Sequence, residues 1–189
     1  MRHVWIAAAA SAVLALAGCT SGNGGTGTPT TSANDAAAVQ YMDKVCAAAS
    51  EFAKLEKSAP KLDSGDPAKL KADMAAYMGQ LSAAFTKSAE ELRKVGPSPI
   101  AGGEAAVNKM ADAFTTLGAT FTEAKTKIEQ ADANDPSGGL QAAGEAISKL
   151  SQLADPLKDL EAVPELEKAA TSAPKCQEMR NLGVAPTSR

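Results

Sequence analysis

The spacing of apolar residues between positions 107 and 131 constrains the fold more than any other feature of the chain. They recur at alternating steps of three and four residues, as Val107, Met110, Phe114, Leu117, Phe121, Ala124, Ile128 and Ala131. This spacing places all of them on one face of an α-helix, whereas a strand would need alternation at every second residue. The mean period of about 3.5 residues is typical of helices that pack against neighbours with a left-handed twist. Gly118 lies near the same face, where a small residue lets another helix approach.

Composition favours the same structural class for the rest of the chain. Alanine dominates, valine and isoleucine are few, and aromatic residues make up only 4% of the sequence. Alanine is a strong helix former with little side chain to bury. A core of alanine with scattered Leu, Met and Phe therefore suits closely packed helices and makes a poor sheet. The sequence predicts an all-α protein.

Prolines and helix-capping residues divide the apolar pattern into four long segments. The first helix is expected over residues 36–59, with Pro60 after it. The second begins at Asp66-Pro67, an N-cap residue followed by proline at the first helical position, and Gly96-Pro97-Ser98-Pro99 stops it. The third is the segment described above. Asp135-Pro136 opens the fourth, whose apolar face is expected to hold Leu140, Ala143, Ile147, Leu150 and Ala154.

Further prolines shape the C-terminal part of the chain. Asp155-Pro156 is expected to kink or restart the fourth helix, because proline lacks the backbone N–H and crowds the preceding turn. Pro164 and Pro174 divide the tail further. The apolar pattern continues past the break as Leu157, Leu160, Val163 and Leu166, and a last short helical turn holds Cys176, Met179 and Leu182. Four long helices with short connections predict an antiparallel up-down four-helix bundle with a kinked fourth helix.

The N-terminal end of the chain indicates export. Arg2 and the initiator amine form a short positive region, and Val4–Leu16 is an unbroken run of apolar or small residues. That length suits the hydrophobic region of a secretory signal and is too short for a membrane span. Leu16-Ala17-Gly18-Cys19 follows, and it closely resembles the lipobox of bacterial lipoproteins. The alternative is a buried helix followed by a chance cysteine, which leaves the coincidence of charge, length and small residues unexplained.

The resemblance implies that residues 1–18 are removed as a signal peptide and that Cys19 then carries a diacylglyceryl group. Two acyl chains anchor a protein stably, whereas one binds a membrane only marginally. The protein is therefore expected on the extracytoplasmic face of the cell membrane, held by the lipid at Cys19. Residues 19–35, rich in Ser, Thr and Gly, are expected to form a flexible linker. A helical bundle domain at 36–182 and a disordered tail at 183–189 complete the expected organisation.

Composition adds a second, weaker resemblance. The chain is similar to the small alanine-rich helical lipoproteins of high-GC bacteria. That similarity implies an exported helical domain and transfers no functional residues.

Removal of the signal would also remove a side chain on which many catalytic and metal sites depend. His3 is the only histidine, and it lies in the signal. The mature protein would then have no Ser-His or Cys-His pair and no histidine base or metal ligand. Loss of Arg2 reduces the 19 basic residues by one, against 22 acidic ones. The mature chain therefore lacks the excess of basic residues that would indicate nucleic-acid binding. We predict no catalytic residue, no cofactor and no metal ligand.

Ser172-Ala173-Pro174-Lys175 matches the S-x-x-K pattern of penicillin-binding proteins and serine β-lactamases. Ser58-Ala59-Pro60-Lys61 repeats it. Neither copy is accompanied by an S-D-N or K-T-G segment, and both stand where a proline ends a predicted helix. We interpret both copies as helix-stop turns.

Three functions of different classes remain. The preferred one is a non-catalytic lipoprotein that organises the envelope or binds an envelope protein partner. The alternative is a ligand-binding module that holds an apolar or amphipathic molecule between its helices. The third is an envelope hydrolase that uses a pair of carboxylates. A fully packed interior would argue against the ligand-binding module, whereas an interhelical cavity with convergent polar groups would favour it. A cleft that holds two facing carboxylates would favour the hydrolase.

Once Cys19 is lipidated, Cys46 and Cys176 are the two cysteines left, and export would place them where disulfides persist. In an up-down bundle the start of the first helix and the end of the fourth lie at the same end. The proline-broken tail could then return Cys176 to the level of Cys46. We predict a structural disulfide between them. The alternative is two separate thiols, with Cys46 buried as a small apolar residue.

Lipidation provides the first test. Cys19→Ser removes the sulfur that accepts the diacylglyceryl group, so the variant should stay an uncut precursor or be released from the membrane. Ser21→Ala changes a residue just beyond the lipobox and should leave processing intact. Mass spectrometry of the mature N-terminus measures both outcomes. A free, unmodified Cys19 in the wild-type protein would contradict the prediction.

Overall fold

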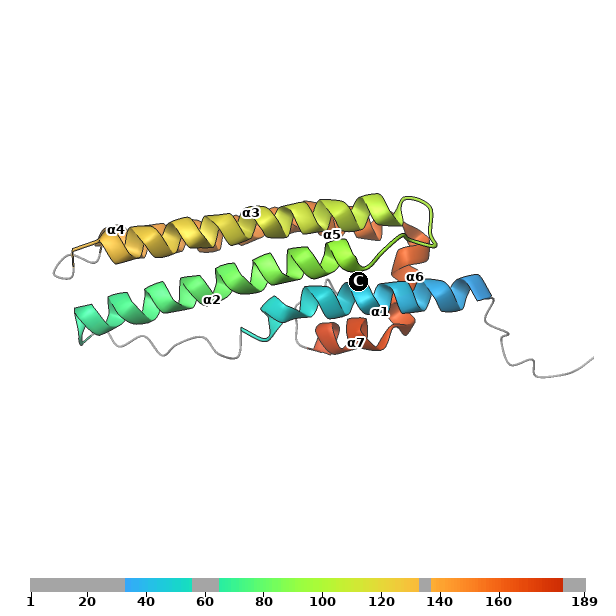
Figure 1. Cartoon of the computed structure of the whole chain (residues 1–189), viewed down its shortest axis with the longest axis horizontal. Helices are drawn as coiled ribbons and strands as arrows, with labels where there is room; N and C mark the ends of the chain where they lie inside the picture. Colours follow the sequence, from blue (N-terminus) through green and yellow to red (C-terminus); the bar gives the residue numbers. More distant parts are fainter. Residues whose placement is uncertain (1–32, 56–64, 133–136, 182–189) are drawn as a thin grey trace, which may run out of the picture. The chain divides into compact units, whose positions relative to one another are not determined.

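The computed structural model describes residues 33–55, 65–132 and 137–181 (Figure 1). Every regular element in these ranges is a helix and none is a strand, so the prediction of an all-α protein is confirmed. In chain order the elements are α1 (Ala33–Ala53), α2 (Pro67–Lys94), α3 (Gly103–Gln130), α4 (Ser137–Ser148), the 3-10 helix η2 (Lys149–Leu153), α5 (Ala154–Glu161), α6 (Pro164–Ser172) and α7 (Pro174–Asn181).

The most extensive packing joins α2 and α3, which lie side by side as an antiparallel pair (green and yellow in Figure 1). The ring of Phe85 on α2 lies between two rings of α3, with centroids 5.4 Å from Phe114 and 5.6 Å from Phe121. The large apolar residues whose spacing predicted α3 are buried: Val107, Met110, Phe114, Leu117, Phe121 and Ile128. The predicted face of α3 is therefore confirmed.

Local signals set both ends of α2 as the sequence predicts. Asp66 is the N-cap, and its Oδ1 accepts a hydrogen bond from the backbone N–H of Lys69 at 3.0 Å. Pro67 occupies the first helical turn, where a missing N–H costs nothing. The helix ends at Lys94, and Gly96 has a φ of 90°, a conformation that glycine adopts readily. The chain therefore turns at Gly96 towards α3.

α1 differs at both ends from its expected range of 36–59. It begins at Ala33, inside the expected linker, and Asp35 in its first turn complements the positive end of the helix dipole. It ends at Ala53. Its last residue described as buried is Ala49. Leu55, beyond the end of α1, is partly buried and still packs against the core. Pro60 lies outside the described residues.

The predicted apolar face of the fourth helical segment is wrong. Leu140 and Ile147 are 44% and 49% exposed, Ala154 is exposed, and only Ala143 of that set is buried. A Cβ added to Gly139 would lie 3.4 Å from the Cα of Ile128 on α3. Close approach of two backbones, rather than large side chains, makes this contact. The residues that α4 buries are accordingly small: Gly139, Ala142, Ala143 and Ala146.

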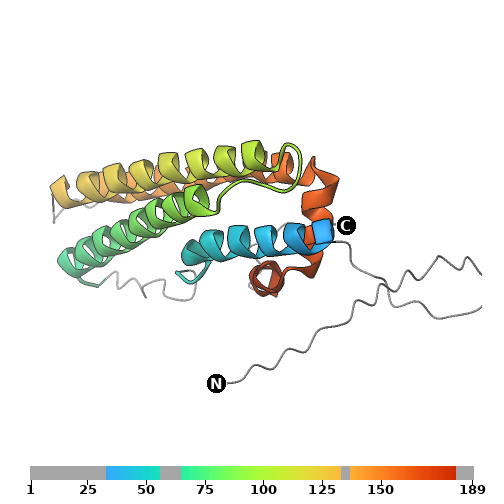
Figure 2. The same ribbon diagram turned by 45° about the vertical axis from the view of Figure 1, so that its right-hand side comes forward.

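Prolines divide the C-terminal part as expected. Pro156 cannot donate a backbone hydrogen bond and crowds the turn before it, and the chain is a 3-10 helix over η2 before α5 begins. Pro164 and Pro174 begin α6 and α7. α5 packs against α3, whereas α6 and α7 pack against α1 (Figure 2).

Several expectations fall on the remaining positions. The expected signal peptide, most of the linker, the cap at Asp135-Pro136 and the tail at 183–189 lie outside the described residues. Within the described ranges, none of the helices combines the length and the hydropathy that a membrane crossing requires.

α2 and α3 approach closely at Gly118, as expected from its small size. A Cβ at this position would lie only 2.7 Å from Thr86 Oγ1 and 3.4 Å from the carbonyl oxygen of Ser82. The carbonyl oxygen of Gly118 also accepts a hydrogen bond from Ser82 Oγ at 2.8 Å. An interhelical hydrogen bond thus lies where a larger side chain would push the helices apart.

Gly118→Ala should therefore lower the free energy of unfolding by about 1–3 kcal/mol, the usual cost of overpacking a buried contact. Gly144→Ala is the matched control, because Gly144 is an exposed residue inside α4 with nothing within 4 Å of an added Cβ. That change should raise the free energy of unfolding by about 0.5–1 kcal/mol through helix propensity. Urea unfolding followed by circular dichroism measures both. A stabilising effect at Gly118 would contradict the close approach.

Candidate functional site

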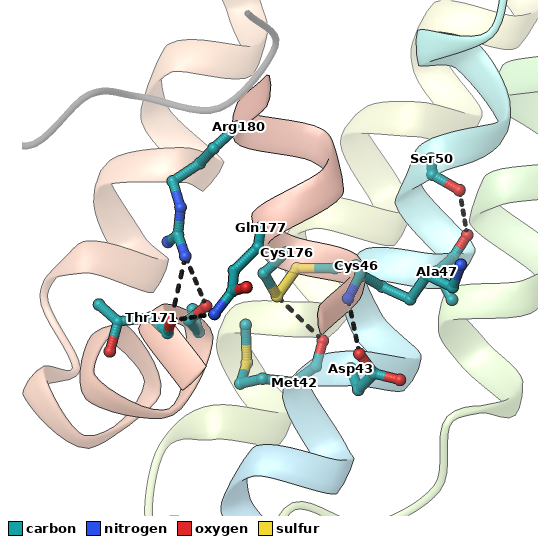
Figure 3. Close-up of a disulfide and its surroundings, with 11 residues drawn as sticks. Met42, Asp43, Cys46, Ala47, Ser50, Thr171, Cys176, Gln177 and Arg180 are labelled. Atoms are coloured by element: carbon teal, nitrogen blue, oxygen red, sulfur yellow. Dashed lines mark hydrogen bonds between the residues drawn. A yellow bond between two sulfur atoms is a disulfide. The ribbon is translucent and has the colours of Figure 1, made fainter. Parts of the chain in front are cut away.

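A disulfide joins Cys46 of α1 to Cys176 of α7, with their Cα atoms 5.0 Å apart (Figure 3). The predicted pairing is confirmed. The two residues are 130 positions apart in the sequence, so the bond closes almost the whole described chain into one loop. Cys176 is buried and Cys46 half-buried. The disulfide therefore fixes the last helix against the first.

Two further contacts hold the start of α7 on α1 (Figure 3). The backbone N–H of Lys175 donates to Asp43 Oδ1 at 2.7 Å. This N–H is in the first turn of α7, where no partner exists within the helix, so Asp43 completes its hydrogen bonding. Cys176 Sγ lies 3.3 Å from the carbonyl oxygen of Met42. A disulfide sulfur carries no proton, so in the oxidised protein this is a close packing contact.

Side chains of α7 cover the C-terminal end of α6 (Figure 3). Arg180 Nη2 donates to the carbonyl oxygens of Ala170 at 3.1 Å and Thr171 at 3.3 Å. Gln177 Nε2 donates to the same Thr171 oxygen at 2.9 Å. Carbonyls in the last turn of a helix lack partners within it, and a positive charge there is favoured by the helix dipole. α6 and α7 therefore form one unit, fastened to α1 at the disulfide.

An apolar cavity of about 220 Å³ lies beside the disulfide, between α1, α3, α5, α6 and α7. A cavity of about 150 Å³ with similar walls is known to hold benzene, whereas drug-sized ligands occupy about 300–1,000 Å³. The space therefore suits one ring or a short acyl segment. Both cysteines line it, with large apolar side chains that include Met42, Phe114, Leu157, Leu160, Leu166 and Met179.

The cavity exists because the side chains of α5 do not pack fully against the core. Leu153, Leu157 and Leu160 line the cavity and are only half-buried. Neither η2 nor α5 contains a buried residue. α5 is held on α3 and α6, with Pro156 in its own first turn and Pro164 at the start of the next helix. Its leucines thus stand over a space that no other side chain fills.

The cavity is partly open, and we call the part of its lining that carries the charged residues Glu161, Glu167 and Arg180 its mouth. Glu161, the last residue of α5, and Glu167 of α6 line it and are both exposed. Among the described residues, neither glutamate has an ion-pair partner. Arg180 also lines the mouth, but its Nη2 is already bound to the carbonyls of α6. The cavity thus joins apolar walls to a polar opening.

The S-x-x-K sequence at residues 172–175 is a junction between two helices. Ser172 ends α6, and Pro174 begins α7. Lys175 Nζ donates to Glu178 Oε2 at 2.8 Å, and this hydrogen bond and the charge of Glu178 raise the pKa of Lys175. A lysine that activates serine must be neutral, so the pKa moves in the wrong direction for that chemistry. Ser58–Lys61 lies outside the described residues.

The sequence predicts the disulfide but does not reveal the cavity. The apolar pattern of the sequence includes Leu157, Leu160 and Leu166. That pattern is the same whether a residue fills a core or lines a cavity. The sequence feature that could have indicated the cavity is the short length of α5 and α6 between prolines, which limits how closely these helices can pack. Cys19 lies outside the described residues, so its lipidation stays a prediction. Within the described ranges, no three His, Cys, Asp or Glu side chains come together as a metal site would require.

The chain matches no family model, no curated protein and no solved structure.

Reduction of the disulfide should lower the melting temperature sharply. A loop of this length contributes about 5 kcal/mol in the chain-entropy model, an upper figure that is comparable to the net stability of many domains. Thermal unfolding with and without reductant measures the effect. The double variant Cys46→Ala/Cys176→Ala should melt low in both conditions, which separates loss of the bond from other effects of reductant. Two reactive thiols in the denatured wild-type protein, without reductant, would rule the bond out.

Proposed function

We propose that this protein is a lipid-anchored, non-catalytic binding protein on the extracytoplasmic face of a bacterial cell membrane, and that it holds the apolar part of an amphipathic molecule between its helices. The cavity beside the Cys46–Cys176 disulfide is the observation that carries this proposal. The resemblance of Leu16–Cys19 to a lipobox supports the anchor at Cys19 and the location.

The cavity favours ligand binding over envelope organisation, which is the preferred function when only the sequence is considered. An envelope-organising protein with an envelope protein partner needs only a surface, and an open space in its interior weakens the packing. This cavity combines apolar walls with a few polar groups at its mouth, which is typical of small-molecule sites. A hydrolase is less well supported, because the walls below Glu161 and Glu167 offer little that would orient a polar substrate.

The size of the cavity limits the affinity that its walls supply. About five buried methylenes at about 0.8 kcal/mol each contribute about 4 kcal/mol, which corresponds to a dissociation constant of about 1 mM. A tighter complex requires further contacts at the mouth. The proposed ligand is therefore amphipathic, with a polar end that remains outside the apolar walls.

We also propose the antiparallel up-down four-helix bundle as the finer description of the fold. α1, α2, α3 and the segment from α4 to α5 would be its four members, with η2 as the kink in the fourth. Packing of α1 on α2, of α2 on α3, and of α3 on α4 and α5 supports this description. α6 and α7 add a C-terminal pair that covers α1.

Isothermal titration with toluene, an uncharged probe with a single ring, tests the cavity. Leu157→Trp adds bulk to a half-buried residue of its wall and should weaken binding of the probe at least tenfold. Leu140→Trp is the matched control, because Leu140 is exposed on α4 and is not among the residues that line the cavity. It should bind like the wild type.

Circular dichroism should show that both variants retain the wild-type helix content. The proposal is wrong if the wild type does not bind the probe saturably, or if folded Leu157→Trp binds it as well as Leu140→Trp does.

A further inference from the structure

From the charges at the mouth of the cavity, we infer that the preferred ligand is an amphiphile whose polar end is cationic, and that Glu161 and Glu167 are the residues that select it. The inference deepens the proposed function and depends on it. Both glutamates line the cavity, one at the end of α5 and the other in the following helix, α6. A ligand whose apolar end lies among the leucines would bring its polar end near these two exposed carboxylates.

The one positive side chain that lines the cavity does not neutralise this pair. Arg180 hydrogen bonds to the carbonyl oxygens of Ala170 and Thr171, in the last turn of α6. The C-terminal end of a helix carries a partial negative charge of about half a unit, which offsets part of the guanidinium charge. Glu161, the last residue of α5, adds a full negative charge to the C-terminal end of its own helix. Glu167, in the first turn of α6, lies at the positive end of its helix, which offsets part of its charge. The side chains that line the cavity still sum to a formal charge of −1.

Each lysine of these helices has another carboxylate within 4 Å, and among the described residues none is that close to Glu161 or Glu167. Lys158 pairs with Asp155 at 3.5 Å, and Lys168 pairs with Asp35 at 3.5 Å. Lys175 pairs with Glu178, and Lys109 of α3 pairs with Asp159 at 3.0 Å. Among the described residues of α5, α6 and α7 no other lysine remains. Glu161 and Glu167 are thus available to a cation that enters the mouth.

The size of the preference follows from the exposure of the two carboxylates. Each is a solvent-exposed charge, and a pair of this kind changes a binding constant by a factor of about two to five. Two such pairs favour a cationic ligand over a neutral one, and an anionic ligand is disfavoured by similar factors. A cationic ligand should bind about tenfold or more tightly than an anionic ligand with the same apolar chain.

Isothermal titration with three amphiphiles of equal chain length, each below its micelle concentration, tests the inference on the full chain. Decyltrimethylammonium should bind most tightly, decyl maltoside next, and decyl sulfate most weakly. The difference should shrink as the salt is raised from about 0.02 M to 1 M, because the Debye length falls to about 3 Å.

The double variant Glu161→Gln/Glu167→Gln removes both charges and keeps the shape of the mouth. It should bind decyl maltoside like the wild type and lose most of the difference between the cationic and anionic ligands. Glu165→Gln is the matched control, because Glu165 is an exposed residue of the same helix that does not line the cavity. It should retain most of the preference.

The outcomes separate the two proposals. Equal or tighter binding of decyl sulfate by the wild type would overturn the selection of cations while leaving the cavity as a binding site. So would a preference that survives unchanged in the double glutamine variant. If none of the three amphiphiles binds the folded protein, the proposed function itself fails, and the inference fails with it.

Discussion

The covalent bond between Cys46 and Cys176 is the constraint on which the last two helices, α6 and α7, depend. α6 and α7 are short, with only Leu166, Ala169 and Cys176 buried between them. Helices of this length are marginal without tertiary contacts. The disulfide holds α7 on α1, and Arg180 and Gln177 in turn hold α6 on α7. One bond thereby positions two helices that carry little apolar surface of their own.

The cavity is a consequence of how this unit meets the rest of the protein. α2 and α3 pack closely through small contacts such as Gly118, and α4 follows α3 through glycine and alanine. α5 cannot continue that approach, because its leucines are too large for a backbone contact and proline interrupts the helix before it. The space between α5 and the disulfide-bound unit therefore stays open, with a floor of methionine, leucine and phenylalanine.

In the proposed function, the apolar walls and the charged residues at the mouth contribute differently to binding. The walls offer non-directional burial, which rewards any apolar segment of the right size. The mouth offers Glu161 and Glu167 without ion-pair partners among the described residues, and such charges act on selectivity more than on affinity. In the proposed function, the lipid on Cys19 would keep this site near a membrane, where amphipathic molecules are concentrated.

Much of the fold was predictable from the sequence because it is encoded locally. The periodic face of α3, the Asp66-Pro67 start of α2 and the proline breaks before α6 and α7 each follow from residues close together in the chain. The disulfide followed from having two cysteines left once Cys19 is assigned to lipid. The face of α4 and the cavity required the tertiary structure. Periodicity shows which side of a helix is apolar, but not how near the neighbouring helix stands. That distance decides whether Gly139 or Leu140 is buried, and whether Leu157 fills a core or lines a space.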